Sequence, residues 1–124
     1  MATKREYIEL IGRLTELTQS EKLEWERNPA PESLDSPETK VDSVYEVEYK
    51  DRYLRLYEQR YKHFTDEFDF YWSDRAVLEI VDGGGGLLWK FPELRSTQQL
   101  LEAAQYREAG VDDFLRDVFE EGDE

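Results

Sequence analysis

From Val44 the hydrophobic pattern takes a period of two: Tyr45, Val47 and Tyr49 alternate with glutamates, and after Lys50 and Asp51 the period of two returns over residues 52–61. This alternation is typical of strands that bury one face, and the two charged residues mark a turn. A reversal between Lys50 and Asp51 gives four cross-strand pairs: Val47 with Leu54, Tyr45 with Leu56, Glu46 with Arg55, and Val44 with Tyr57. The stretch therefore predicts a hairpin with one aliphatic and aromatic face and one charged, tyrosine-rich face.

A second hairpin is predicted over residues 76–91, where two apolar runs flank Asp82 and four consecutive glycines. Glycine adopts positive φ without steric cost, so the chain can reverse about Gly84 and Gly85. The resulting register pairs Ile80 with Trp89, Leu78 with Phe91, Val81 with Leu88, and Glu79 with Lys90. One side of this hairpin should be buried, and the other should carry the pair of Glu79 and Lys90.

The N-terminal segment has the pattern of an amphipathic helix that ends near Thr18. Thr3 and Glu6 have the spacing of a capping box. Apolar residues then recur at helical intervals: Tyr7, Leu10, Ile11, Leu14 and Leu17. We expect this stripe to pack on the sheet, because barely two heptads is too short to favour the alternative, a dimer seam.

Two further helices are predicted near the C-terminus. Ser96 and Gln99 have capping-box spacing and open a short helix that Gly110 stops. Asp112 caps a final helix, whose apolar face consists of Phe114, Leu115, Val118 and Phe119. The acidic tail, residues 120–124, should fray into solvent.

The region between the first helix and the first hairpin is less regular. Leu23 and Trp25 alternate with charged residues and suggest a short edge strand. Residues 28–42 contain three prolines and almost nothing apolar, and they predict a mobile surface loop. A loop of this length is either disordered or functional, and the lack of an aromatic anchor favours disorder over partner binding.

The predicted fold class is therefore α+β, in a single domain of residues 1–124. It comprises an N-terminal helix, an antiparallel sheet of two β-hairpins with a fifth short strand, and two C-terminal helices packed on one face. A domain of this size buries roughly two-thirds of the surface of its unfolded chain, which is enough for a core.

The chain carries 30 acidic and 16 basic residues, for a formal net charge of −14. Nucleic acids and anionic lipids bind clustered Lys and Arg, so direct binding to either is disfavoured. Three interpretations of the acidity remain: a carboxylate-rich surface suited to a salt-rich cytoplasm, docking on a basic protein partner, and mimicry of a nucleic acid backbone that inhibits a nucleic-acid-binding protein. Exposed tyrosines and an open sheet edge would also permit a homodimer.

The chain contains no cysteine, which excludes disulfides, thiol catalysis and cysteine-ligated metal and fits a reducing compartment. The first residues lack an uninterrupted apolar run, and no stretch has the length and hydrophobicity of a membrane span. These features predict a cytoplasmic protein.

Residues 63–75 interleave aromatic side chains with carboxylates, a mixture unusual for both a loop and a plain strand. Aromatic rings beside carboxylates can receive a basic partner through cation–π contacts and salt bridges. Alternatively, the rings fold back and cap one end of the sheet, because aromatic residues usually bury large areas. The candidate partner-binding residues are Asp66, Glu67, Phe68, Asp69, Phe70, Tyr71, Trp72 and Asp74.

The sequence assigns no catalytic, cofactor-binding or metal-binding residue. A phosphate loop leads into a helix and ends in Gly-Lys-Ser/Thr, whereas here the glycines lead into an apolar strand. His63 is the only histidine, so no site with two His ligands exists. Paired carboxylates beside aromatics leave one enzymatic alternative, a carboxylate-dependent hydrolase that uses Asp66, Glu67, Asp69 and Asp74.

Three local patterns follow one another along the chain. They are a helix end with Thr18, Leu23 and Trp25, a Leu-x-Ile-x-Asp strand with Leu78, Ile80 and Asp82, and a helix opened by Gly110, Val111 and Asp112. With this plan the chain resembles small uncharacterised prokaryotic α+β proteins. Its acidic surface looks like that of proteins from salt-loving archaea. The resemblance implies a fold but no activity and no site residues.

The sequence thus predicts a non-enzymatic acidic interaction module, an adaptor or regulatory subunit that binds a basic protein partner without a cofactor. The nucleic-acid mimic and the carboxylate hydrolase are the alternatives.

Overall fold

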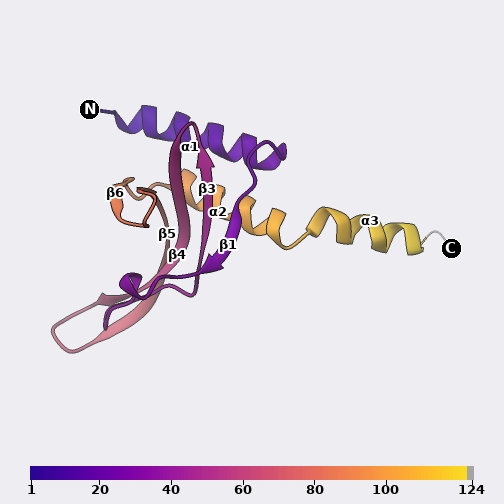
Figure 1. The fold of residues 1–124 in the computed structure, drawn as a ribbon. Helices are drawn as coiled ribbons and strands as arrows, with labels where there is room; N and C mark the ends of the chain where they lie inside the picture. The colour runs from indigo at the N-terminus through magenta and orange to yellow at the C-terminus, as the bar shows by residue number, and fades with distance from the viewer. Residues whose placement is uncertain (123–124) are drawn as a thin grey trace.

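The computed structural model describes residues 1–122, and the side chains of residues 1–120. The elements in chain order are α1 (Lys4–Gln19), β1 (Glu26–Pro29), the short 3-10 helix η1 (Glu32–Leu34), β2 (Thr39–Lys40), β3 (Ser43–Tyr49), β4 (Arg52–Phe64), β5 (Phe70–Val81), β6 (Leu87–Lys90), α2 (Arg95–Glu108) and α3 (Val111–Gly122). The strands form one antiparallel sheet in the order β1-β3-β4-β5-β6, and β2 also pairs with β4. Helices α1 and α2 lie against the sheet, whereas α3 extends away from it (Figure 1). The predicted α+β class is confirmed.

The main core lies between the sheet and the two helices. Residue Ile11 of α1 and Leu100 of α2 are fully buried against Leu56 and Leu78 of the central strands. Helix α1 begins with the predicted capping box, because the backbone N–H of Glu6 donates to Thr3 and that of Thr3 donates to the Glu6 carboxylate. The predicted stripe of α1 is therefore its buried face, except for Leu10, which is exposed.

A hydrogen-bonded threonine fixes the chain just after α1. The Thr18 hydroxyl donates to the Leu14 carbonyl over 2.8 Å and accepts from the indole Nε1 of Trp25 over 2.9 Å. Thr18 is fully buried and Leu23 packs in the main core, so these side chains fix the segment that connects α1 to β1. The short strand predicted around Leu23 and Trp25 instead begins after them, as β1 at Glu26. Leu23 is buried in the main core, and Trp25 packs against it.

The register of the first predicted hairpin is confirmed at three of its four pairs, with β3 and β4 joined at Lys50 and Asp51. The fourth pair, Val44 with Tyr57, lies one step beyond the residues over which the two strands pair. Both turn residues have positive φ. In the second hairpin, two predicted pairs are confirmed by the strand register: Ile80 with Trp89, and Glu79 with Lys90. The predicted pair of Leu78 with Phe91 is supported by a 2.9 Å hydrogen bond from the Phe91 N–H to the Leu78 carbonyl. The pairing of Val81 with Leu88 is wrong, because a bulge after Ile80 shifts the register and brings Val81 opposite Leu87.

Strands β4 and β5 pair with each other over twelve residue pairs, which joins the two predicted hairpins into one sheet. This hairpin, the longest in the sheet, was not predicted from the sequence. Its far part, residues 60–74, continues beyond the helices, and we call it the arm (Figure 1). Strand β2 pairs with the base of the arm at Arg60 and Tyr61.

The second face of the sheet is covered by the segment predicted as a loop. Residues 28–42 include the end of β1, η1 and β2, and they bring Leu34 and Val41 onto a small apolar cluster with Tyr57 and Val77. The face predicted to be charged and tyrosine-rich is therefore buried in its central part. The mobility of this segment stays a prediction.

Helix α2 begins earlier than its predicted capping box. Its N-cap is Leu94, which packs against the main core, and Ser96 lies inside the first turn. The Ser96 hydroxyl is buried and has no hydrogen-bond partner among the described residues, so the predicted capping role is wrong. Burial of Leu94 sets this start, whereas Gly110, with φ +69°, ends the helical path as predicted.

The packing predicted for the last helix is wrong. Helix α3 leaves the body after Gly110, because α1 and α2 already occupy that face of the sheet. Asp112 lies within α3 rather than capping it, and its carboxylate accepts from the Tyr106 hydroxyl over 2.7 Å. Residues 120–122 continue α3 instead of fraying, and residues 123 and 124 of the predicted tail lie outside the described residues. Across residues 1–122, no helix has the length and apolar character that crossing a membrane requires.

Candidate protein-interaction surface

The arm presents two side-chain faces, because directly opposed residues of an antiparallel pair project to the same side. The first face is the continuation of the face that α1 and α2 cover. It carries Arg60, Lys62, Phe64, Phe70, Trp72 and Asp74. The opposite face carries Tyr61, His63, Tyr71 and Ser73. The eight predicted site residues are therefore divided between these two faces and the turn that joins the strands.

The turn of the arm, residues 65–69, is organised by one carboxylate. Asp66 accepts hydrogen bonds from the backbone N–H groups of Phe68 and Asp69 at 2.8 and 2.9 Å. These bonds to its charged form hold the pKa of Asp66 below its ordinary value of 3.8. Phe68 projects from this turn with 87% of its surface exposed, flanked in sequence by Asp66, Glu67 and Asp69.

The first face of the arm places aromatic rings beside the chain's own cations. Lys40, Arg60 and Lys62 all approach the Trp72 ring, at 5.8, 5.8 and 5.6 Å from its centroid, and Lys62 lies 4.4 Å from the Phe70 centroid. The Phe70 ring is edge-on to Trp72, with 6.2 Å between the ring centroids, and it is tilted against Phe64, with 5.7 Å between the centroids. We call this set the platform: Lys40, Arg60, Lys62, Phe64, Phe70 and Trp72.

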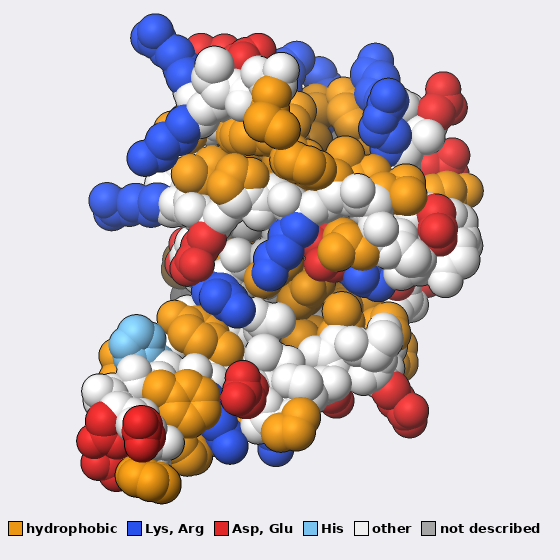
Figure 2. Space-filling view, turned by 90° about the vertical axis from the view of Figure 1, so that its left-hand side faces the viewer, with side chains coloured by type: hydrophobic (Ala, Val, Ile, Leu, Met, Phe, Trp, Pro, Cys, Tyr) orange, Lys and Arg blue, Asp and Glu red, His pale blue; other side chains and the backbone are white. Residues whose placement is uncertain are grey.

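The opposite face of the arm has its own ring contacts. The rings of His63 and Tyr71 lie 4.9 Å apart, and the Arg75 guanidinium lies 4.3 Å from the Tyr61 centroid. Figure 2 shows the single histidine, pale blue, at lower left, with hydrophobic side chains (orange) beside it and carboxylates (red) near the extremity. Tyr71 is therefore separated from Phe70 and Trp72 by the thickness of the strand pair.

The aromatic side chains of the arm do not fold back to cap the sheet. Tyr61 at the base is partly buried, but the exposed fractions of Phe64, Phe68, Phe70, Tyr71 and Trp72 range from 37% for Trp72 to 87% for Phe68. The arm is a two-stranded projection with no helix over it, so its rings have only each other and nearby cations to pack against. The alternative in which the rings become core is therefore wrong.

Two further apolar surfaces are exposed, and neither was a candidate site predicted from the sequence. Strand β6, at the edge of the sheet, exposes Leu87, Leu88 and Trp89. Helix α3 exposes its entire predicted apolar face. The available signal was the strong amphipathic pattern of α3, but a pattern indicates an apolar face without showing what covers it.

A buried ion pair lies under the glycine turn of the second hairpin. Arg55 donates to the Glu79 carboxylate over 2.9 Å, with both residues 3% exposed, and donates to the Gly85 carbonyl over 3.2 Å. Burial, and next the neighbouring Glu79 carboxylate, raise the pKa of Tyr57. The predicted partner of Glu79, Lys90, lies opposite it across β6 but is exposed, so the ion pair forms with Arg55 instead. This cluster fixes the turn to the sheet.

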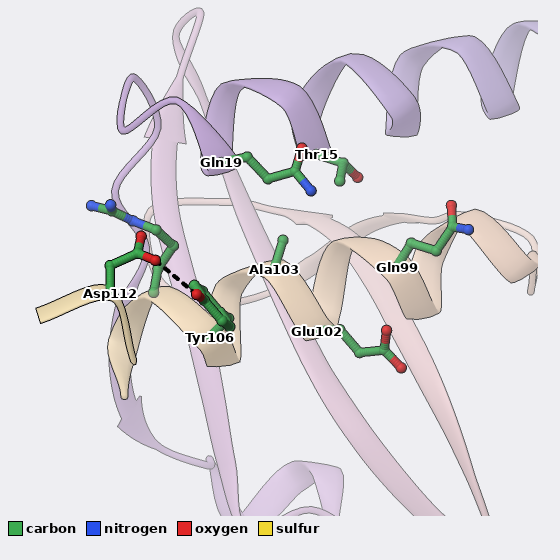
Figure 3. Close-up of a pocket in the computed structure, with 8 residues that line it drawn as sticks. Thr15, Gln19, Gln99, Glu102, Ala103, Tyr106 and Asp112 are labelled. Carbon is green, nitrogen blue, oxygen red and sulfur yellow. Dashed lines mark hydrogen bonds between the residues drawn. The ribbon is translucent and has the colours of Figure 1, made fainter. Parts of the chain in front are cut away.

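An open cleft of about 690 Å³ separates α1 from the end of α2 (Figure 3). It is lined by Thr15, Gln19, Gln99, Glu102, Ala103, Tyr106, Arg107 and Asp112. The hydrogen bond from Tyr106 to Asp112 raises the pKa of the phenol, and Arg107 pairs with Glu21. These groups stabilise the junction of α2 and α3 and do not form a nucleophile with an adjacent base. Among the side chains that the structure describes, no group of three acidic, His or Cys residues is placed to hold a metal ion.

No protein-family model, no curated protein and no solved structure matches this chain. The resemblance to small prokaryotic α+β proteins stays a prediction. Any proposal about function therefore depends on the surfaces described above.

Proposed function

We propose that the protein is a non-enzymatic interaction module whose arm turn binds a basic protein partner. The observation that carries this proposal is Phe68, the most exposed ring of the arm, held at its extremity between carboxylates. A large exposed aromatic residue within a charged rim is the arrangement of an interface anchor. The partner surface would be an apolar pocket with Lys or Arg at its edge.

The turn supports this role because it is ordered before binding. The Asp66 carboxylate holds the backbone through two hydrogen bonds, so the carboxylates of Glu67 and Asp69 are free to meet a partner. A turn that is already in shape loses less conformational entropy on association than a flexible loop. The excess of carboxylate over the whole chain would add long-range attraction to a basic partner.

The test is affinity capture from the native cell extract by three forms of the tagged full-length protein. The first form is the wild type, the second is Phe68→Ala, and the third is Glu67→Gln/Asp69→Asn. Matched controls make the same kinds of change elsewhere, with Leu88→Ala for an exposed apolar residue and Glu24→Gln/Glu48→Gln for two exposed carboxylates. Retained proteins are identified by mass spectrometry at low and high salt.

We expect a basic protein that the wild type and both controls retain at low salt, that high salt releases, and that both turn variants lose by roughly tenfold or more. Retention by Phe68→Ala, or capture of no basic protein by the wild type, would contradict the proposal. Addition of duplex DNA to the captured complex examines the mimic hypothesis, since a nucleic-acid mimic would be displaced.

A further inference from the structure

Helix α3 carries an apolar stripe that no other part of the chain described by the structure covers. Phe114 and Phe119 are 65% and 66% exposed, and Leu115 and Val118 between them are also exposed. A helix of this length is marginal in isolation, and its stability ordinarily comes from packing of its apolar face. The exposed stripe therefore indicates a docking surface.

The polar side of α3 is acidic. Its charged residues through position 120 are Asp112, Asp113, Arg116, Asp117 and Glu120. The only cation among them, Arg116, lies 3.1 Å from Asp113 on the same helix and is thereby already paired. A surface that covers α3 must therefore combine apolar contact area with positive charge.

The platform of the arm has this combination. It gathers three of the chain's 16 cations around two exposed rings, Phe70 and Trp72, in a molecule whose net charge is −14. Asp74 of the same face pairs only loosely with Arg60, at 3.9 Å and with both side chains more than half exposed. An acidic helix thus finds on the platform both apolar partners for its phenylalanines and cations for its carboxylates.

We propose that α3 of one molecule docks on the platform of a second copy of this chain. The arm and α3 leave the body in opposite directions (Figure 1), so the two surfaces of one molecule cannot meet each other. The contact is therefore heterologous, and it leaves one free platform and one free α3 in every pair. Such head-to-tail contacts close into rings or extend into chains.

This inference goes beyond the proposed function and uses different residues, since the platform excludes Phe68 and the turn carboxylates. The interface consists of one short helix on one hairpin face. Small interfaces of this kind give weak association, with a dissociation constant of roughly 1 μM or larger. Attraction between unlike charges at its rim is weakened by salt.

The test is the solution mass of the full-length protein, measured by sedimentation across a concentration series that reaches roughly millimolar. The platform variant is Arg60→Glu/Lys62→Glu, and its matched control, Lys4→Glu/Lys22→Glu, makes the same charge change at exposed positions outside both surfaces. The α3 variant is Phe114→Ser/Phe119→Ser, and its control is Leu88→Ser on β6. Circular dichroism verifies that each variant keeps its secondary structure.

The decisive sample is an equal mixture of the platform variant and the α3 variant. The first keeps an intact α3 and the second keeps an intact platform, so each can make one contact only. We expect the wild type and both controls to increase in mass with concentration beyond a dimer, and each variant alone to stay monomeric. The mixture should form a one-to-one dimer and nothing larger, and its association should weaken in high salt.

Four outcomes would overturn the proposal. They are a wild type that stays monomeric at every concentration, a platform variant that associates like its control, an α3 variant that does so, and a mixture in which no dimer forms. Loss of association in the α3 variant alone would assign the stripe to pairing between two α3 helices instead. Because Phe68 is intact throughout, none of these results bears on the turn proposed to bind a basic protein.

Discussion

The same two strands carry two cross-strand ion pairs in very different surroundings. Arg55 and Glu79 are opposed in the body of the sheet, 2.9 Å apart, with side chains only 4% exposed. Arg60 and Asp74 are opposed in the arm, 3.9 Å apart, with side chains 51% and 59% exposed. In both pairs the two residues are directly opposite each other in the register. The difference in distance and exposure therefore comes from what covers the strands at each position.

The hairpin of β4 and β5 therefore serves two purposes. Over the body, helices cover one face, and on the other face Arg55 and Glu79 lie under the glycine turn, where Arg55 also donates to the Gly85 carbonyl, so the charges lose water and must pair closely. Along the arm, no element covers the first face, and the same alternation of residues leaves cations beside exposed rings. The body is thereby stabilised internally, whereas the arm remains available for contacts with other molecules.

The largest expected effect comes from breaking the buried pair. Glu79→Gln removes one charge and leaves Arg55 buried and unpaired, which should lower the free energy of unfolding by about 3–5 kcal/mol. Asp74→Asn makes the corresponding change in the arm and should cost about 1 kcal/mol or less. Urea denaturation of the two variants measures both values.

A double variant tests whether the loss comes from the unpaired buried charge. Arg55→Met/Glu79→Leu replaces the buried charges by apolar groups and should recover most of the stability lost in Glu79→Gln. Equal losses in Glu79→Gln and Asp74→Asn would mean that burial does not distinguish the pairs. In that case the contrast between body and arm would not hold.

A smaller effect should appear at high pH and should come from the body alone. Burial raises the pKa of Tyr57 in the folded state, so the folded chain keeps the phenol neutral after the unfolded chain has ionised it. The resulting stabilisation is complete below pH 10 and is lost as the pH rises above 10, by about 1.4 kcal/mol per pH unit for one such group. Denaturant unfolding from pH 8 to 11 measures this slope.

Tyr57→Phe should flatten that part of the pH dependence, whereas Tyr53→Phe, at an exposed position of the same strand, should leave it unchanged. A slope that is the same in both variants would show that the buried phenol is not its source.

The smallest expected effect lies in the arm and at low pH. The folded turn lowers the pKa of Asp66, so its contribution to order is present above the ordinary value of 3.8 and is lost as the pH falls through the lower folded value. The amide resonances of Phe68 and Asp69 should titrate with a midpoint below 3.8 in NMR spectra.

Asp66→Asn should abolish this titration without changing the denaturation midpoint of the body, and Glu67→Gln should preserve it. A change of body stability in Asp66→Asn would instead mean that the turn and the body unfold as one unit.

Local patterns were sufficient to predict those parts of the fold that local chemistry determines. The turn at Lys50 and Asp51 and the capping box of Thr3 and Glu6 could be predicted because neighbouring residues specify them. The pairing of β4 with β5 was missed because residues 65–69 contain no Gly, Pro or Asn. Asp66 supplies the turn chemistry there, and one aspartate in an acidic chain is a weak signal.

The remaining differences concern what covers each surface, which periodicity does not encode. Glu79 is opposite Arg55 on β4 and opposite Lys90 on β6. It pairs with Arg55 because that residue is buried beside it, and burial is not visible in the sequence pattern. The apolar faces of α1 and α3 are similar as patterns, yet one is core and the other is exposed. For the candidate site, the residues could be selected from sequence, but their division between the turn and two faces followed only from the register.

The three tryptophans provide the molecule with separate optical reporters. Trp25 is hydrogen-bonded at the end of α1, Trp72 belongs to the arm, and Trp89 lies on the edge strand β6. Variants that keep one indole each would therefore report on three regions by fluorescence. The Trp72 ring lies next to cations and is partly exposed. The wavelength and quenching of its emission would therefore follow the binding of a partner to the arm in real time without any attached dye.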